Sequence, residues 1–160
     1  MKVLWAPWRL EYILAPKPDA CVFCVPQHTN EDEERLILHR GKHAFVLLNK
    51  FPYNNGHLLI APYRHVSDIA ALKKNESHEI MDLLQVSSQM LQKGLSPEGV
   101  NMGLNLGKAA GAGICGHLHF HAVPRWSGDS SFMAVLDEIS LVPEHLKDTY
   151  KRLLVLFKSL

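Results

Sequence analysis

The sequence predicts an α+β domain in which one main helix lies on one face of an antiparallel sheet of about five strands. Three short runs rich in β-branched and aromatic residues come first, and turn clusters separate them. A segment with helical periodicity follows, and then two further strand-like runs. No linker or internal repeat divides the 160 residues, which is an ordinary length for one domain. We therefore expect a single core.

The first three strands are expected at residues 36–39, 43–49 and 57–62. A turn around Gly41 joins the first two into a hairpin. Residues 52–56 read Pro-Tyr-Asn-Asn-Gly, a composition typical of a turn, and a proline ends the third run. These runs predict an antiparallel meander.

The main helix is expected to begin at Asn75 or Ser77, because apolar residues recur at helical spacing from there until Gly94, where we expect it to end. A fourth strand is expected at residues 100–105, and the fifth at residues 116–123. The helix has one apolar face, which we expect to pack on the sheet.

A last helix is expected to begin at Pro143 and to carry an apolar stripe, which is typical of a core or dimer contact. Residues 1–34 are interpreted as a wrapping segment that contains a Cys-x-x-Cys pair, residues 35–126 as the catalytic sheet and helix, and residues 127–160 as a C-terminal extension. Together they form one predicted domain, residues 1–160.

Composition limits the class of protein. Hydrophobic residues make up 47% and charged residues 21%, and no apolar run approaches the roughly 18–20 residues of a membrane span. The first residues lack the pattern of a secretion signal, so we expect a cytoplasmic protein without a membrane partner. The formal charge of +1 offers no overall field for a nucleic acid polymer, so an anionic ligand must be held by local groups.

Three histidines alternate with apolar residues in the fifth strand. With a period of two, His117, His119 and His121 face one side of the strand. Neighbouring side chains on one face lie about 6.5–7 Å apart, so the three rings can serve one phosphate-sized group, or one of them can bind a metal. Ordinary polar-face histidines are the alternative, but three in strict alternation beside a glycine-rich run favour a functional site.

The middle histidine is the candidate nucleophile. A neutral imidazole has one free nitrogen near neutral pH, so His119 can attack the α-phosphorus of a nucleotide. Its other nitrogen has to be held as the correct tautomer, and a backbone carbonyl is the expected partner. His121 is interpreted as a donor to a phosphate or bridging oxygen, with His117 on the other flank.

The glycine-rich run precedes the histidines. Gly107, Gly111 and Gly113 allow the backbone to approach phosphate closely and to form a nest of N–H groups. A flexible hairpin is the alternative interpretation of such a loop. Lys108 is a candidate for an additional cation, or else an ordinary surface lysine.

Cys21 and Cys24 form a Cys-x-x-Cys pair, which in a cytosolic chain indicates metal or redox chemistry before a structural disulfide. Two thiolates together with two imidazoles would make a closed tetrahedral set that suits structural zinc.

The His-x-His-x-His pattern resembles the signature of the histidine triad (HIT) superfamily of nucleotidyl hydrolases and transferases. Residues 5–9, 49–58, 103–107 and 121–129 extend the similarity to the bacterial branch that includes diadenosine tetraphosphate phosphorylases. One departure is residues 113–116, which lack the Ser or Gln that many phosphoramidase-type relatives have there.

The resemblance implies a HIT-like fold whose sheets pair in a homodimer, and a covalent nucleotidyl intermediate on His119 that the flanking histidines support. It also implies that Asn105 reaches the phosphate and that Asn49 holds ribose hydroxyls. In many bacterial relatives zinc is bound by the Cys-x-x-Cys pair, a histidine after the third strand and the first histidine of the triad. These positions correspond to Cys21, Cys24, His65 and His117, so the resemblance implies these four residues as the metal ligands.

The resulting hypothesis is a nucleotidyl transferase that cleaves dinucleoside polyphosphates of the diadenosine tetraphosphate type. Phosphate as the second acceptor would make it a phosphorylase, and water would make it a hydrolase. The alternatives are a nucleotide-binding module without turnover, which has no need of a nucleophile, and a zinc-stabilised domain without a nucleotide ligand.

Overall fold

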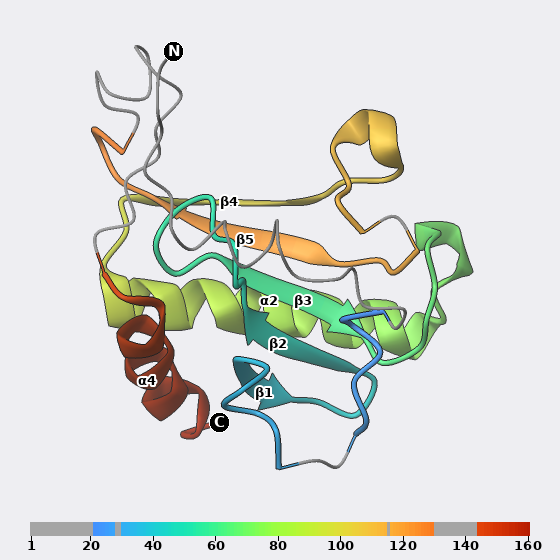
Figure 1. The fold of residues 1–160 in the computed structure, drawn as a ribbon, viewed down its shortest axis with the longest axis horizontal. Helices are drawn as coiled ribbons and strands as arrows, with labels where there is room; N and C mark the ends of the chain where they lie inside the picture. Colours follow the sequence, from blue (N-terminus) through green and yellow to red (C-terminus); the bar gives the residue numbers. More distant parts are fainter. Residues whose placement is uncertain (1–20, 28–29, 115, 130–143) are drawn as a thin grey trace, which may run out of the picture.

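The structure is a computed structural model that describes residues 21–27, 30–114, 116–129 and 144–160 (Figure 1). It contains one five-stranded antiparallel sheet and two main helices, which confirms the predicted fold class. The strands are β1 (Ile37–Arg40), β2 (Ala44–Leu48), β3 (Leu58–Pro62), β4 (Gly99–Leu104) and β5 (Phe120–Arg125). The helices are α2 (Lys74–Leu95) and α4 (Leu146–Phe157), with single 3-10 turns η1 (Ile69–Ala71) and η2 (Lys108–Ala110).

The strand order is β1-β2-β3-β5-β4, so the first three strands form the predicted meander and β5 is inserted between β3 and β4. The pairing register puts His121 opposite Leu59 of β3 on one side and opposite Gly103 of β4 on the other. His121 is therefore held in the interior of the sheet and not at an edge.

The two faces of the sheet carry separate apolar clusters. The larger one includes Ile60 and Ala122 and packs against α2 and α4, which lie behind and beside the sheet in Figure 1. The smaller one, on the opposite face, includes Phe23, Phe45 and Leu59. Since His121 pairs with Leu59, it faces the smaller cluster, away from the helices.

Helix α2 differs from the expectation at both ends. Helix α2 begins at Lys74, one residue before Asn75, because the N–H of Lys73 donates to the Glu76 carboxylate and closes the first turn. The prediction that Gly94 ends the helix is wrong, since α2 continues to Leu95. A side chain at position 94 would stand 3.0 Å from atoms of α4, so this glycine allows the two helices to approach. The expected start at Pro143 lies outside the described residues.

The fifth strand is shorter at its beginning than predicted. It starts at Phe120, so His117 and His119 lie in the irregular segment before it. The reason is that the N–H of Leu118 donates to the carbonyl of Val66 at 2.6 Å, which takes this segment away from the β3 ladder. The histidines nevertheless share one side, because Phe23 of the smaller cluster contacts the rings of both His117 and His119.

Among the described residues, no helix combines the length and the apolar character that a membrane span requires.

The turn between β1 and β2 is held by a carboxylate from α2. Glu79 accepts hydrogen bonds from the backbone N–H groups of Lys42, at 2.7 Å, of Ala44, at 3.0 Å, and of His43. A side chain at Gly41 would collide with this carboxylate, at 2.6 Å. The hairpin and the helix are therefore joined by one charged acceptor.

We expect Glu79→Ala to lower the free energy of unfolding by about 2 kcal/mol, because it leaves three backbone donors without their acceptor. Urea denaturation checks this value. Asp82→Ala, on an exposed position of the same helix, is the matched control and should change stability by at most about 0.5 kcal/mol. Equal effects of the two substitutions would contradict this account of the turn.

Candidate active site

The geometry around His119 fixes its tautomer. Its Nδ1 lies 2.9 Å from the carbonyl oxygen of His117, and because a carbonyl only accepts, Nδ1 carries the proton. The lone pair is therefore on Nε2. The residue is 8% exposed, which keeps the ring largely out of water. The sequence-based expectation of a backbone carbonyl behind this imidazole agrees with the contact.

A second histidine pair lies beside it. Nδ1 of His57 accepts the backbone N–H of Tyr53 at 3.1 Å, so the ring proton of His57 is on Nε2. This Nε2–H donates to Nδ1 of His121 at 2.9 Å. His121 must then carry its own proton on Nε2, a buried atom without a hydrogen-bond partner among the described residues. The result is an available N–H donor beside the lone pair of His119, whose ring centroid is 5.0 Å from that of His121.

Burial keeps this cluster uncharged. It lowers the pKa of His57 to about 3, and the nearby His121 and His119 add to the effect. It lowers the pKa of His121 to about 4, again with a contribution from His119. The pKa of His119 is also lowered by burial, against the opposing effect of its hydrogen bond to the carbonyl of His117. At neutral pH the site therefore presents one imidazole lone pair and one N–H donor.

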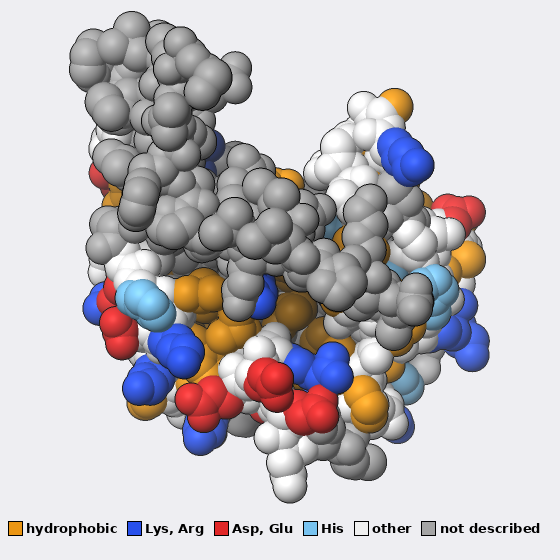
Figure 2. All heavy atoms as spheres, viewed as in Figure 1, with side chains coloured by type: hydrophobic (Ala, Val, Ile, Leu, Met, Phe, Trp, Pro, Cys, Tyr) orange, Lys and Arg blue, Asp and Glu red, His pale blue; other side chains and the backbone are white. Residues whose placement is uncertain are grey.

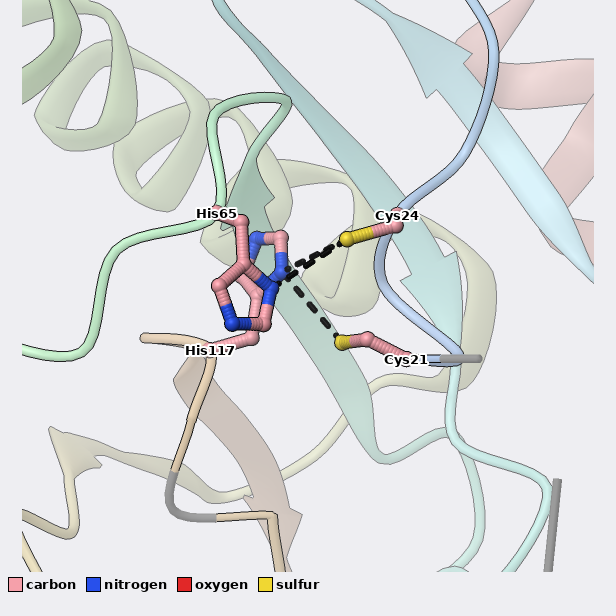
Figure 3. Close-up of side chains that lie close together, drawn as sticks. All are labelled: Cys21, Cys24, His65 and His117. Atoms are coloured by element: carbon pink, nitrogen blue, oxygen red, sulfur yellow. Dashed lines mark hydrogen bonds between the residues drawn. The ribbon is translucent and has the colours of Figure 1, made fainter. Parts of the chain in front are cut away.

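Four side chains form a separate cluster next to His119, and Figure 3 shows them pointing toward one another. They are Cys21, Cys24, His65 and His117, and their ligand atoms all lie within 4.8 Å of one another. Nε2 of His117 donates to the carbonyl of Pro62 at 2.8 Å, which leaves the Nδ1 lone pair directed at the sulfurs. All four metal ligands expected from the sequence are thus brought together.

The distances in this cluster fit a tetrahedral metal site. The Sγ of Cys24 is 3.2 Å from Nδ1 of His65, and the Sγ of Cys21 is 3.4 Å from Nδ1 of His117. Bond lengths of about 2.3 Å to sulfur and 2.0–2.1 Å to nitrogen around one zinc ion place S and N about 3.5 Å apart. The donor set and the spacing therefore agree with zinc.

An ion pair holds the segment that carries His65. Arg64 donates to both carboxylate oxygens of Glu76, at 2.9 and 2.6 Å, and to the carbonyl of Ala71 at 2.7 Å. This guanidinium holds the pKa of Glu76 at about 2. The backbone next to His65 is thereby fixed to the start of α2.

The glycine-rich loop contains η2, and Figures 1 and 2 show this segment standing out from the body of the protein. Gly107 and Gly111 adopt φ values of 80° and 88°, which favour glycine, whereas Gly113 does not. The N–H groups of residues 110 to 112 donate within the loop. The predicted nest is therefore not formed by these three groups, and Lys108 lies on the exposed surface.

The two asparagines expected near the ligand have different environments. Asn105 directly follows β4, where Leu104 pairs with Phe120, so it leaves the sheet level with the histidines. Asn49 instead faces inward: its Oδ1 accepts the N–H of Phe51 at 2.9 Å, and its Nδ2 donates to Nδ1 of His57 at 3.2 Å. The side chain of Asn49 therefore supports His57 in this structure.

Sequence reasoning missed His57. It was expected only as the first residue of the third strand, and the structure places it just before β3. The alternation of side chains along a strand could have indicated that His57 lies near the triad. Residues 57, 59 and 61 share a face, and residue 59 pairs with His121. This inference needs the strand register, which the sequence does not supply.

Comparison with known proteins identifies a HIT domain over residues 30–128. An AP-4-A phosphorylase from Mycobacterium tuberculosis is 40% identical over 159 residues, a match that covers 94% of this chain and 81% of the relative. A bis(5'-adenosyl)-triphosphatase from Saccharomyces cerevisiae is 29% identical over 91 residues, covering 56% of this chain and 44% of that protein.

Solved structures share the fold. A Zn-bound histidine triad family protein from Mycobacterium smegmatis superimposes with a TM-score of 0.67 at 24% identity, covering 88% of this chain and 94% of that chain. The domain match spans β1 to β5 and includes the three alternating histidines. The sequence match, the fold and the placement of these histidines agree, and they show that the chain belongs to the HIT family.

Proposed function

We propose that this chain is a nucleotidyl transferase that cleaves dinucleoside polyphosphates through a covalent intermediate on His119. The proposal is supported mainly by the tautomers of two neighbouring histidines. Nε2 of His119 carries a lone pair, whereas Nε2 of His121 carries a proton that it can donate. The names of the relatives, a phosphorylase and a triphosphatase of adenosine polyphosphates, support this substrate class.

In the first step Nε2 of His119 attacks the α-phosphorus, an N–P bond forms, and the bond to the bridging oxygen breaks. The oxygen leaves with the electron pair as part of a nucleoside polyphosphate, and the N–H of His121 donates a hydrogen bond to it. The modified imidazole keeps its Nδ1 proton and becomes positively charged. The carbonyl of His117 stabilises that charge, since it accepts the Nδ1–H at 2.9 Å.

In the second step an acceptor attacks the same phosphorus, the N–P bond breaks, and its electron pair returns to Nε2 of His119. Phosphate as acceptor releases a nucleoside diphosphate, and water releases a monophosphate. The relative with 40% identity is named a phosphorylase, which favours phosphate. Lys108, which is exposed, is the cation we propose for attracting it.

We also propose that Cys21, Cys24, His65 and His117 hold a structural zinc ion, a choice supported by the donor set and by the Zn-bound neighbour of the same fold. When bound, zinc supplies a fixed crosslink and no chemistry of the reaction, because all four positions are filled by protein ligands. Through His117 it would steady the carbonyl that holds His119.

We further propose that residues 1–160 act as one domain and that two copies of the chain form a homodimer. The exposed edge of β4 (Gly99–Leu104), including Met102 at 43% exposure, supports an interface between copies. We propose the cytoplasm as the compartment, because it keeps thiol ligands reduced.

Mass spectrometry of the intact protein tests the proposed function. After brief mixing with diadenosine tetraphosphate, wild type should carry a transient adenylyl adduct, and His119→Gly should carry none. Added phosphate should accelerate loss of the adduct and yield ADP if phosphate is the acceptor. Binding of the nucleotide without adduct or products over hours would contradict the transferase and leave a nucleotide-binding module.

Removal of the metal tests the second part of the proposal. We expect one zinc per chain by elemental analysis, and a fall in the melting temperature of roughly 10 °C on chelation, because structural zinc contributes directly to folding. Cys24→Ser should bind less zinc and melt close to the chelated wild type. His78→Ala, at an exposed position of α2 outside the cluster, is the control and should match wild type in both measurements.

The lowered pKa values make stability depend on pH. Between pH 7 and 5 the unfolded chain takes up protons at His57 and His121, while the folded protein, with pKa values of about 3 and about 4, does not. Acid therefore favours unfolding, and His57 alone should account for about 1–2 kcal/mol of the loss. Urea unfolding at the two pH values measures it.

His57→Asn is the matching variant, since an amide oxygen can still accept the N–H of Tyr53 but does not titrate. Its stability should fall less between pH 7 and 5 than that of wild type. Chelator in all samples removes any contribution from the metal ligands. Parallel curves for the two proteins would contradict the assignment of His57 as a buried neutral histidine.

A further inference from the structure

Phe23 occupies a special place in the metal-binding turn. It lies between the two cysteine ligands, and the N–H of Cys24 donates to the carbonyl of Cys21 at 3.0 Å to close the turn. The side chain is only 2% exposed, so it points inward from a turn whose outer residue, Val22, is 47% exposed. The turn therefore presents one aromatic ring to the interior.

This ring lies against the nucleophile. The centroids of Phe23 and His119 are 4.6 Å apart with an interplanar angle of 28°, which is a stacked pair. The ring of His117, a proposed metal ligand, is 5.5 Å away at 56°. One phenyl group thus contacts both the histidine that carries the chemistry and a histidine of the metal cluster.

The hydrogen bonds of His119 leave one motion of its ring unrestrained. The bond from Nδ1 to the carbonyl of His117 fixes the tautomer, but the ring turns about two bonds, Cα–Cβ and Cβ–Cγ, and one contact restrains only a combination of these two rotations. A flat group against one face removes this freedom, and the ring of His121 meets His119 at 62° on another side. The direction of the Nε2 lone pair then depends on Phe23.

We infer that Phe23 is a positioning residue that holds the imidazole of His119 in its reactive orientation and makes that orientation depend on the metal-binding turn. For its kinetic consequence the inference rests on the proposed nucleotidyl transfer. The position of Phe23 between Cys21 and Cys24 means that metal binding at both cysteines fixes the ring. Metal binding would therefore affect the orientation of the His119 ring through this stacked pair as well as through His117.

The alternative is that Phe23 only fills the smaller apolar cluster. Val25 provides the matched control, because it belongs to the same cluster and is 7% exposed, but it is not among the rings stacked on the histidines. Loss of packing alone predicts similar behaviour of Phe23→Leu and Val25→Ala. Leucine keeps an apolar side chain but has no flat face.

Kinetics provide the first test, on the metal-loaded full chain. Phe23→Leu should lower kcat for diadenosine tetraphosphate by about five- to tenfold with KM nearly unchanged, because the stacked pair is lost while the buried ring has no direct role in substrate binding. Val25→Ala should leave kcat within about twofold of wild type. Equal losses of kcat in the two variants would overturn the inference.

Nuclear magnetic resonance of the protein with ¹⁵N-labelled histidine tests the role of Phe23 without a measurement of enzyme activity. In wild type the two ring nitrogens of His119 should give separate protonated and unprotonated signals, and the rings of Phe23 and His119 should show Overhauser contacts. In Phe23→Leu, and in chelated wild type, the tautomer should be kept, but the Overhauser contacts between the rings of His119 and His121 should weaken as the ring of His119 reorients. Unchanged contacts between these two rings in Phe23→Leu would overturn the inference.

The two tests separate the inference from the proposed function. If wild type forms no adenylyl adduct, the proposed reaction fails, and the resonance experiment still decides the role of Phe23. If Phe23→Leu does not fold, Phe23→Met replaces it with the same expected change. Absence of Overhauser contacts between the two rings in wild type would overturn the inference without any substitution.

Discussion

The hydrogen bond from Nδ1 of His119 to the carbonyl of His117 is the contact on which the site depends. A carbonyl inside a β-ladder would accept from a neighbouring strand and would not be available to a side chain. Here β5 begins only at Phe120, so the carbonyl of residue 117 lies outside the ladder. The irregular start of the strand is thus what allows the backbone to fix the tautomer of a histidine two residues ahead.

Contacts near the end of β3 keep the segment in this irregular form. His117 donates to the carbonyl of Pro62 at 2.8 Å, and the N–H of Leu118 donates to Val66 at 2.6 Å. His65 lies between these two acceptors and belongs to the metal cluster. The proposed zinc would therefore crosslink the same stretch that the hydrogen bonds hold. A structural ion in this position would act on the site by fixing its backbone.

Local pattern was sufficient to predict the sheet and the shared side of the three histidines, since alternation is a property of short segments, whereas the metal ligand set came from the family resemblance. Three features depend on contacts between distant segments and could not be predicted. The start of β5 is set by carbonyls some fifty residues away, such as that of Pro62. His57 gains its role from the register of Leu59 and His121, and Gly94 is required by helix α4.

The hydrogen-bond directions also limit what His121 can do. Its Nδ1 already accepts from His57, whose own Nδ1 accepts from a backbone N–H, so within the described part of the chain no hydrogen-bonded group supplies a proton to replace one lost from His121. Full proton transfer to the leaving oxygen would create an imidazolate, which is unfavourable in a buried site. A polyphosphate leaving group does not need that proton, because its terminal phosphate ionises near pH 6. The arrangement therefore suits the proposed departure of a polyphosphate anion that is stabilised by a hydrogen bond.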